Sequence, residues 1–298
     1  MLEHTPVMSK EVIKFLAPHH DENFIDATCG LGGHAKLILE KISPNGKLLA
    51  IDQDGVALEK AEKNLKKFAD RVTFAHDNFS ELGLLIRDWK VSRVDGILFD
   101  LGVSNYQFSE KERGFSFNQN ARLDMRMSPE RQRVSAYEII NRYDLRELKK
   151  ILSVYGEEPF AQKIAKEIVR VRDSKPIETT TELVEVIRRA TPPKYRFSQK
   201  KHFATSTFRA LRMAVNDELG VLESGLKQAV GVLSPGGRIV VISFHSLEDR
   251  IVKNFFRENT ALKILTPKPI IASTEEISQN PKARSAKLRA AIKIFENL

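Results

Sequence analysis

Four short apolar segments recur in the first hundred residues, with amphipathic helical patterns between them. They span residues 23–30, 47–54, 72–79 and 94–102, and each is bounded by turn residues. Short, almost continuously apolar strands that alternate with helices are typical of a parallel sheet covered by helices on both faces. The alternation therefore predicts an α/β fold.

The next comparable segment, residues 237–244, follows only after more than a hundred residues. A crossover between parallel strands needs far fewer. The intervening sequence contains helical patterns, and Asp144 and Thr179 each precede a Glu at the spacing of a capping box. We therefore predict an all-helical insertion over residues 106–203, followed by one long helix over 204–232.

Two further apolar segments, residues 262–266 and 286–295, follow a helical pattern that we expect to be capped by Ser246. They complete a mostly parallel sheet of seven strands, in which the last two form an antiparallel edge. The sequence thus predicts a sheet domain built from residues 1–105 and 204–298, interrupted by the helical insertion.

The turn after the first strand contains Gly30, Gly32 and Gly33 directly before a helical pattern. Free backbone N–H groups at such a helix start bind anionic or dipolar ligands. Gly30-x-Gly32-x-x-Ala35 fits the loose dinucleotide fingerprint, and Asp52 lies where an acid would meet ribose hydroxyls. On this motif alone NAD is a candidate cofactor, and a tight turn without any ligand is also open.

Neighbouring residues favour S-adenosylmethionine over NAD. Asp26 ends the first strand four residues before Gly30, and its carboxylate can accept from the ammonium of a methionine moiety, which NAD lacks. His34 lies on the first helical turn, where its ring would reach the carboxylate end of that moiety. Phe79 follows the third strand and offers a face to adenine. Asp100 ends the fourth strand at the same edge of the sheet, so we predict S-adenosylmethionine as the cofactor.

The charge distribution indicates a polyanionic partner. The formal net charge is +9 and the sequence pI is about 9.5. Residues 188–212 contain eight Lys or Arg and no acid, and residues 277–295 contain five and no acid. Two such runs favour nucleic acid over two solvated surface segments.

Other features limit where the chain works and what it binds. No apolar run approaches the length of a membrane span, and the first residues lack a secretory signal, so we expect a cytoplasmic protein. The single cysteine, Cys29, excludes an internal disulfide and a cysteine-based zinc cluster, and we expect it to pack in the core.

Ten sequence blocks, in order from His4 to about Arg289, resemble the bacterial MraW family, the ribosomal RNA small-subunit methyltransferases H. The blocks are HTPVM, FIDATCGLGGHA, LLAIDQD, FDLGVSNYQF, RGFSF, LDMRM, YGEEPFAQKIA, ATSTFRALRMAVNDEL, LSPGGRIVVISFHSLEDRIVK and NPKARSAKLR. Departures from the family pattern occur at residues 105–106, at 120–122, and at Phe203, Ser206 and Arg209. None of these departures removes an expected cofactor contact. The departures in the helical insertion affect how the insertion binds RNA.

The resemblance implies a class I, Rossmann-like methyltransferase fold with a helical insertion for substrate recognition. It implies methyl transfer from S-adenosylmethionine to the N4 amine of a cytidine in the decoding region of 16S rRNA, with the assembled small ribosomal subunit as substrate. The sequence is compatible with a monomer or a homodimer. The sulfonium of the cofactor carries the driving force for methyl transfer, so the chemistry requires no metal. The cofactor contacts carried over by motif are Gly32, Gly33, His34, Asp52, Phe79, Asp100 and Gln107.

Asp100 is the candidate catalytic residue. Its placement resembles the D-P-P-Y loop of amino-methyltransferases, although the sequence here is D-L-G-V. We hypothesise that Asp100 accepts hydrogen bonds from the target amine; the alternative is that it only holds the cofactor. Phe115 and Phe117 either stack on an unpaired base or pack in the core, and His245 either lines the base pocket or belongs to a structural turn.

Three other functions remain open at this stage. A methyltransferase acting on DNA amines is disfavoured by the loop after Asp100 and by the lack of a target-recognition domain. An NAD-dependent oxidoreductase is tested by which cofactor binds. An RNA-binding assembly factor with a vestigial cofactor site is disfavoured by the intact glycine turn.

Overall fold

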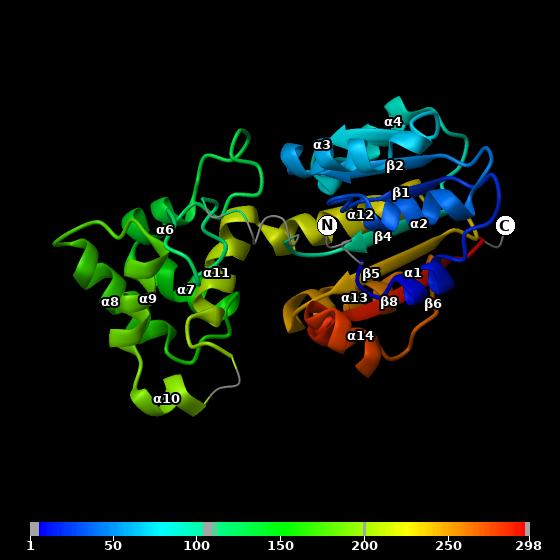
Figure 1. Ribbon diagram of the computed structural model, residues 1–298. Helices are drawn as coiled ribbons and strands as arrows, with labels where there is room; N and C mark the ends of the chain where they lie inside the picture. The colour runs from blue at the N-terminus through cyan, green and yellow to red at the C-terminus, as the bar shows by residue number, and fades with distance from the viewer. Residues whose placement is uncertain (1–5, 104–109, 111, 199–200, 296–298) are drawn as a thin grey trace. The chain divides into compact units, whose positions relative to one another are not determined.

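The computed structural model describes residues 6–103, 110, 112–198 and 201–295, which form two compact units. The sheet unit comprises residues 1–102 and 219–298, and the helical unit comprises residues 103–218 (Figure 1). Each unit has its own hydrophobic core. Among the described residues, no helix is both long and apolar enough to cross a membrane.

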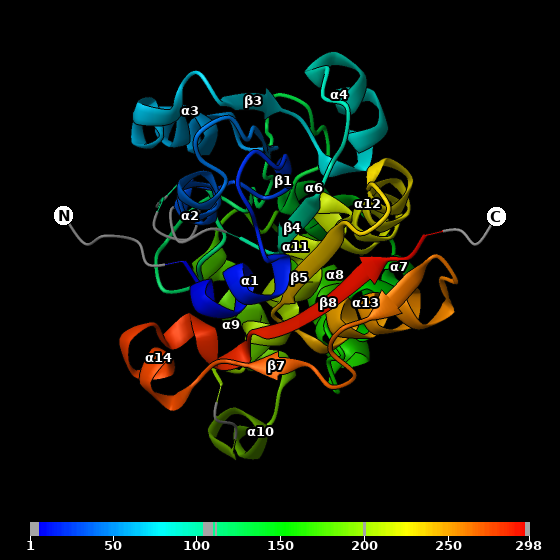
Figure 2. The same ribbon diagram turned by 90° about the vertical axis from the view of Figure 1, so that its right-hand side faces the viewer.

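The sheet has the order β3-β2-β1-β4-β5-β8-β6, with β7 paired to β8 (Figure 2). Strands β1 to β5 are parallel, whereas β8 runs antiparallel to β5, β6 and β7. This confirms the mostly parallel sheet and its antiparallel edge. The strands are β1 (Phe24–Asp26), β2 (Leu48–Asp52), β3 (Val72–His76), β4 (Gly96–Asp100), β5 (Arg238–Ser243), β6 (Leu262–Ile264), β7 (Ile270–Ile271) and β8 (Lys287–Lys293). Seven of these strands match the predicted segments, and β7 is additional because two residues carry no readable periodicity.

Helices cover both faces of the sheet, because alternate residues of each buried strand point to opposite faces. Leu48 and Ala50 of β2 join one core cluster, and Leu49 and Ile51 join the other. The first face carries α1 (Ser9–Leu16), α2 (Gly33–Lys41) and α3 (Gly55–Asn64). The second face carries α4 (Leu82–Trp89), α12 (Glu218–Val232) and α13 (Ser246–Glu258). Figure 2 shows the two helical layers on either side of the strands.

Shorter elements complete the sheet unit. They are η1 (Lys66–Phe68), η2 (Phe79–Glu81), α14 (Thr274–Gln279) and η3 (Pro281–Ser285).

The helical unit packs amphipathic helices around one apolar core. Its helices are α6 (Ala136–Arg142), α7 (Leu145–Val154), α8 (Ala161–Arg172), α9 (Thr180–Ala190), α10 (Pro193–Ser198) and α11 (Thr205–Asn216). The predicted capping boxes at Asp144 and Thr179 are confirmed, and Ser135 forms a third with Glu138.

The prediction of one long helix over residues 204–232 was wrong. Asp217 has φ 45° and ψ 42°, in the left-handed region, and separates α11 from α12. Phe208 of α11 is buried in the helical core, whereas Leu222 of α12 is buried in the sheet core. The two helices thus belong to different cores, and the helical unit ends at residue 218 rather than at the predicted 203.

Candidate active site

Three aspartates lie at the carboxyl ends of neighbouring strands in the sheet unit. Asp26 ends β1, Asp52 ends β2 and Asp100 ends β4. β1 pairs in parallel with both β2 and β4, so the three residues share one edge of the sheet. Ligands of open α/β sheets bind at this edge.

Asp52 holds the glycine turn in place. One carboxylate oxygen accepts from the Gly30 N–H at 2.7 Å, and the other accepts from the Asp54 N–H at 2.9 Å. The turn needs glycine, because Gly30 has φ 54° and Gly32 has φ 84°. Burial raises the pKa of Asp52 to about 6, although the two N–H donors oppose the shift. The sequence singled out Asp52 only as a ligand contact and gave no sign of this tether.

Asp26 is almost completely buried, with 1% of its surface exposed. Its Oδ1 accepts from the Thr28 N–H at 3.2 Å, whereas its Oδ2 has no hydrogen-bond partner in the part of the chain that the structure describes. Burial, together with the charge of the nearby Asp52, raises the pKa of Asp26 to about 7, although the backbone N–H groups of Thr28 and Ala35 oppose the shift. Asp26 is therefore a buried acceptor with unused capacity.

Asp100 faces His34, whose ring lies on the first turn of α2. The His34 Nε2 and Asp100 Oδ2 atoms are 3.6 Å apart, with 6% and 25% of the two side chains exposed. The backbone N–H of Asp100 donates to Thr28 Oγ1 at 2.6 Å. The other carboxylate oxygen, Oδ1, is buried without a hydrogen-bond partner among the described residues.

The electrostatic surroundings favour the neutral form of Asp100. Desolvation, together with the charges of Asp26 and Glu248, raises its pKa to about 8, although Lys282 of η3 opposes the shift. Lys282 belongs to the block NPKARSAKLR, but nothing in the spacing of that block indicated its proximity to Asp100.

The three raised pKa values have one chemical consequence. Asp26, Asp52 and Asp100 are carboxylates whose negative charge is poorly compensated at this edge. A positively charged ligand would stabilise their ionised forms. S-adenosylmethionine carries a sulfonium and an ammonium group, and the unpartnered oxygens of Asp26 and Asp100 can accept from a donor such as the ammonium. The carboxylates at this edge therefore fit this cofactor.

Phe79 packs against the second face of the sheet. Its ring lies 5.3 Å from that of Phe99 in an edge-to-face arrangement. A Cβ atom added to Gly225 of α12 would lie 2.5 Å from Phe79 Cδ2, so the glycine admits the ring. Beside Phe79, the Asn78 Nδ2 donates to Gln53 Oε1 at 3.0 Å and joins the ends of β2 and β3. Sequence reasoning did not single out Gln53.

Of the remaining residues singled out in the sequence, Cys29 lies in the core of the sheet unit. Gln107 lies outside the described residues. Cys29 is buried in the sheet core, and burial raises the pKa of its thiol, which confirms the packing interpretation.

His245 rather than Ser246 caps α13. Its Nδ1 accepts from the Glu248 N–H, and the Glu248 carboxylate accepts from the His245 N–H. The Ser246 prediction was wrong by one residue, because an imidazole nitrogen takes the place of the expected hydroxyl.

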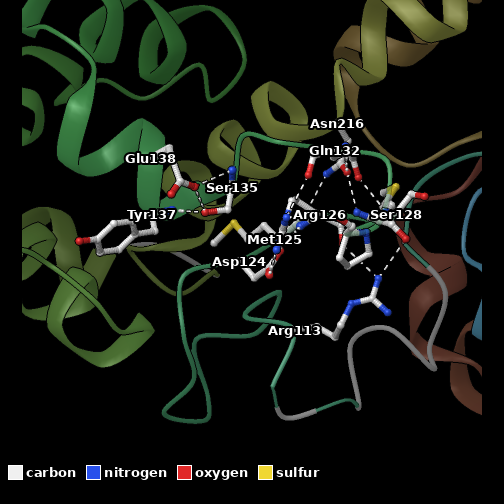
Figure 3. Close-up of polar contacts among 12 residues, drawn as sticks. Arg113, Asp124, Met125, Arg126, Ser128, Gln132, Ser135, Tyr137, Glu138 and Asn216 are labelled. Atoms are coloured by element: carbon white, nitrogen blue, oxygen red, sulfur yellow. Dashed lines mark hydrogen bonds and ion pairs between the residues drawn. The ribbon is translucent and has the colours of Figure 1, made fainter.

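In the helical unit, a polar network fixes the loop that contains the block LDMRM (Figure 3). Arg126 binds both carboxylate oxygens of Asp124, at 2.8 and 2.7 Å, and also donates to the Pro129 and Gln132 carbonyls. Arg113 donates to the Arg126 and Met127 carbonyls, each at 3.0 Å. The loop is thus held by guanidinium groups that bind main-chain oxygens.

The two aromatic residues before this loop differ in burial. Phe115 is 5% exposed and belongs to the helical core, so the packing alternative holds for it. Phe117 is only partly buried, and its ring stacks on His202 at a centroid distance of 4.6 Å.

The fold and the site define a Rossmann-like, class I S-adenosylmethionine-dependent methyltransferase. The chain belongs to the MraW methylase family, whose model matches residues 1–294. Three proteins named ribosomal RNA small subunit methyltransferase H are similar to it. The one from Kosmotoga olearia is 47% identical, covering 98% of this chain and 97% of the relative. Those from Trichormus variabilis and Sulfurihydrogenibium sp. are 49% and 48% identical, covering 98% and 99% of this chain and 92% and 100% of the relatives.

Proposed function

We propose that this chain methylates the N4 amine of a cytidine in the decoding region of 16S rRNA, with the assembled small ribosomal subunit as substrate in the cytoplasm. The names of its relatives support an rRNA substrate of the small subunit. The uncompensated carboxylates at the sheet edge support a cationic methyl donor. The helical unit would recognise the RNA.

The cofactor would be held by the glycine turn and by the strand ends beside it. Asp26 would accept a hydrogen bond from the ammonium group of the cofactor. Asp52 would hold the glycine turn through its N–H donors, with its carboxylate facing the ribose of the cofactor. The other proposed contacts are Gly32, Gly33, His34, Phe79, Asp100 and Gln107. Bound S-adenosylmethionine supplies an electrophilic methyl group.

The catalytic role proposed for Asp100 follows from the weakness of the nucleophile. The N4 lone pair of cytosine is delocalised into the ring, so the nitrogen must be made more tetrahedral before it attacks. Asp100 would accept a hydrogen bond from an N4–H and take up the proton that the nitrogen releases. The observation that carries this role is that Oδ1 of Asp100 has no hydrogen-bond partner among the described residues, while Oδ2 lies 3.6 Å from His34 Nε2. His34 would hold the carboxylate in position.

Two alternatives are weaker. An NAD-dependent oxidoreductase is set aside, because the chain belongs to a methylase family. An assembly factor with a vestigial site would have no need for a turn that Asp52 tethers. Nor would it need two buried carboxylate oxygens, Asp26 Oδ2 and Asp100 Oδ1, that have no hydrogen-bond partner in the described part of the chain.

Methyl transfer to small subunits that lack the modification tests the proposal, with nucleoside mass spectrometry of the product. We expect N4-methylcytidine with the native chain, and a rate at least about 100-fold lower with Asp100→Asn, because loss of a general base costs that much or more. Asp88→Asn, an exposed carboxylate on α4, is the matched control and should retain activity. Calorimetric titration with S-adenosylmethionine separates the two roles of Asp100. Unchanged affinity in Asp100→Asn supports catalysis, whereas an equally large loss of affinity reduces Asp100 to a cofactor contact.

A further inference from the structure

The short helix α10 is fixed to the helical unit by two of its residues. The Tyr195 hydroxyl donates to the Glu158 carboxylate, with both oxygens 3.0 Å away, and its ring lies 4.7 Å from that of Phe160. Arg196 donates to the Arg188 and Thr191 carbonyls near the end of α9. Glu158 itself is buried, so α10 has a firm attachment on this side.

Phe197 and Lys194 lie on the other side of α10. Phe197 is 84% exposed, the highest value among the exposed large apolar side chains of the described residues. Lys194 precedes it by three residues, which places both on one face of the helix, and it is exposed as well. The two anchoring residues of α10 are thus consecutive, with an exposed cation before them and an exposed ring after them.

Two lysines close to Phe197 in the chain are available to a ligand. Arg188 and Arg189 of the basic run both pair with Glu185, at 2.6 and 2.9 Å. Lys194 and Lys201, by contrast, have no acidic partner among the residues that the structure describes, and both are exposed. Residues 188–212 contain no acid at all, so the segment that carries Lys194, Phe197 and Lys201 is basic.

We propose that α10 is a stacking platform for an unpaired base of the RNA outside the target cytidine, with Phe197 under the base and Lys194 and Lys201 on the adjacent phosphates. An exposed aromatic ring beside unpaired cations is the arrangement by which proteins hold single-stranded nucleic acid without reading its sequence. A double helix offers no free base face to such a ring. The inference rests on the proposed function, because that function makes RNA the partner.

The test is the affinity of the full chain for a fluorescent single-stranded oligonucleotide, measured by anisotropy at several salt concentrations. Phe197→Ala should weaken binding by roughly 5- to 100-fold, the range observed for one stacked base, and Phe197→Trp should retain it. Leu84→Ala removes an exposed apolar side chain (56%) from α4 of the sheet unit, outside both basic runs, and serves as the control with unchanged affinity. Lys194→Ala should lower the salt slope by roughly 0.7, the value for one phosphate of a single strand.

Three outcomes would overturn this proposal. The first is equal affinity of Phe197→Ala and Leu84→Ala for the oligonucleotide. The second is equal binding of a blunt duplex and of the single strand by the native chain. The third is a Phe197-dependent attachment to anionic phospholipid vesicles in place of RNA. Circular dichroism of Phe197→Ala should match that of the native chain, because the ring is exposed. Oligonucleotide binding needs no methyl transfer. Phe197-dependent binding without methylation of the subunit would therefore reject the proposed function alone, and methylation with an unaffected Phe197→Ala would reject the platform alone.

Discussion

The side-chain amide of Asn216 connects the last turn of α11 to the main chain of Met125. Its Nδ2 donates to the Met125 carbonyl at 2.8 Å and to the Arg212 carbonyl at 2.7 Å. Its Oδ1 accepts from the Met127 N–H at 2.8 Å. Met125 has φ 60° and is fully buried, so this amide holds a backbone conformation that is unfavourable for a residue with a side chain.

Replacing Asn216 with Asp should destabilise the helical unit by about 2–4 kcal/mol, because a carboxylate oxygen would then face two carbonyl oxygens in a buried site. Denaturant unfolding monitored by circular dichroism measures this change. Asn120→Asp introduces the same charge at an exposed position and should stay within about 0.5 kcal/mol of the native value. Similar stabilities of the two variants would contradict the role assigned to Asn216.

Two glycine substitutions should have opposite effects on stability. At Gly32, alanine meets a φ of 84° and a Leu65 Cδ1 atom 3.0 Å from the new Cβ, so we expect a loss of about 1–2 kcal/mol and weaker binding of S-adenosylmethionine. At Gly231 in α12, a Cβ atom would meet nothing within 4 Å, so alanine should stabilise the protein by about 0.4–1 kcal/mol. Thermal unfolding with and without the cofactor measures the stability of each variant and its stabilisation by the ligand. A Gly32→Ala variant that is more stable than the native chain would contradict the role assigned to glycine in this turn.

The cofactor-free protein should lose stability as the pH rises from about 4 to 8. The pKa of Asp26 is raised from 3.8 to about 7 and that of Asp100 to about 8, so the native state binds more protons than the unfolded state in this window. The free energy of unfolding therefore falls with rising pH, by at most about 1.4 kcal/mol per pH unit for each carboxyl. Denaturant midpoints across this range provide the measurement. Asp26→Asn should flatten the dependence of the unfolding free energy on pH, while Asp70→Asn, at an exposed position, should leave it unchanged. Equal slopes of unfolding free energy against pH in the two variants would rule out Asp26 as a source of this dependence.

S-adenosylmethionine should bind more tightly at pH 8 than at pH 6 and should release protons as it binds. The ligand is cationic and favours the ionised carboxylates, whose protons leave when it enters. Calorimetric titrations in buffers of different ionisation enthalpy count these protons. Asp26→Asn should reduce both the proton release and the affinity. An affinity that is independent of pH would show that the three aspartates do not sense the ligand's charge.

Much of the sheet unit could be predicted from its sequence, because buried parallel strands appear as nearly continuous apolar runs. The segments 47–54 and 94–102 contain β2 and β4 with their terminal aspartates. The edge where Asp26, Asp52 and Asp100 meet followed from the same pattern together with the rule for parallel strands.

The features that the sequence did not reveal depend on tertiary contacts. Asp217 interrupts what looks like one amphipathic helix, since the apolar residues on either side of it serve different cores. The bond from the Gly30 N–H to Asp52 joins the ends of the neighbouring strands β1 and β2. The His245 cap is local, but residue type alone favours Ser246 at that position. Local propensity carries no information on such contacts.

The sheet unit is discontinuous in the chain, and this has a consequence for synthesis on the ribosome. β4 lies in the middle of the sheet, yet its neighbour β5 begins at Arg238, after the whole helical unit has been made. At about 5–20 residues per second, the edge of β4 stays unpaired for roughly seven to thirty seconds in every nascent chain. During that interval the contiguous helical unit can fold, while an apolar strand edge remains open to chaperones or to neighbouring chains. Substitutions that slow the docking of β5 would therefore reduce yield in the cell before they affected the stability of the finished enzyme.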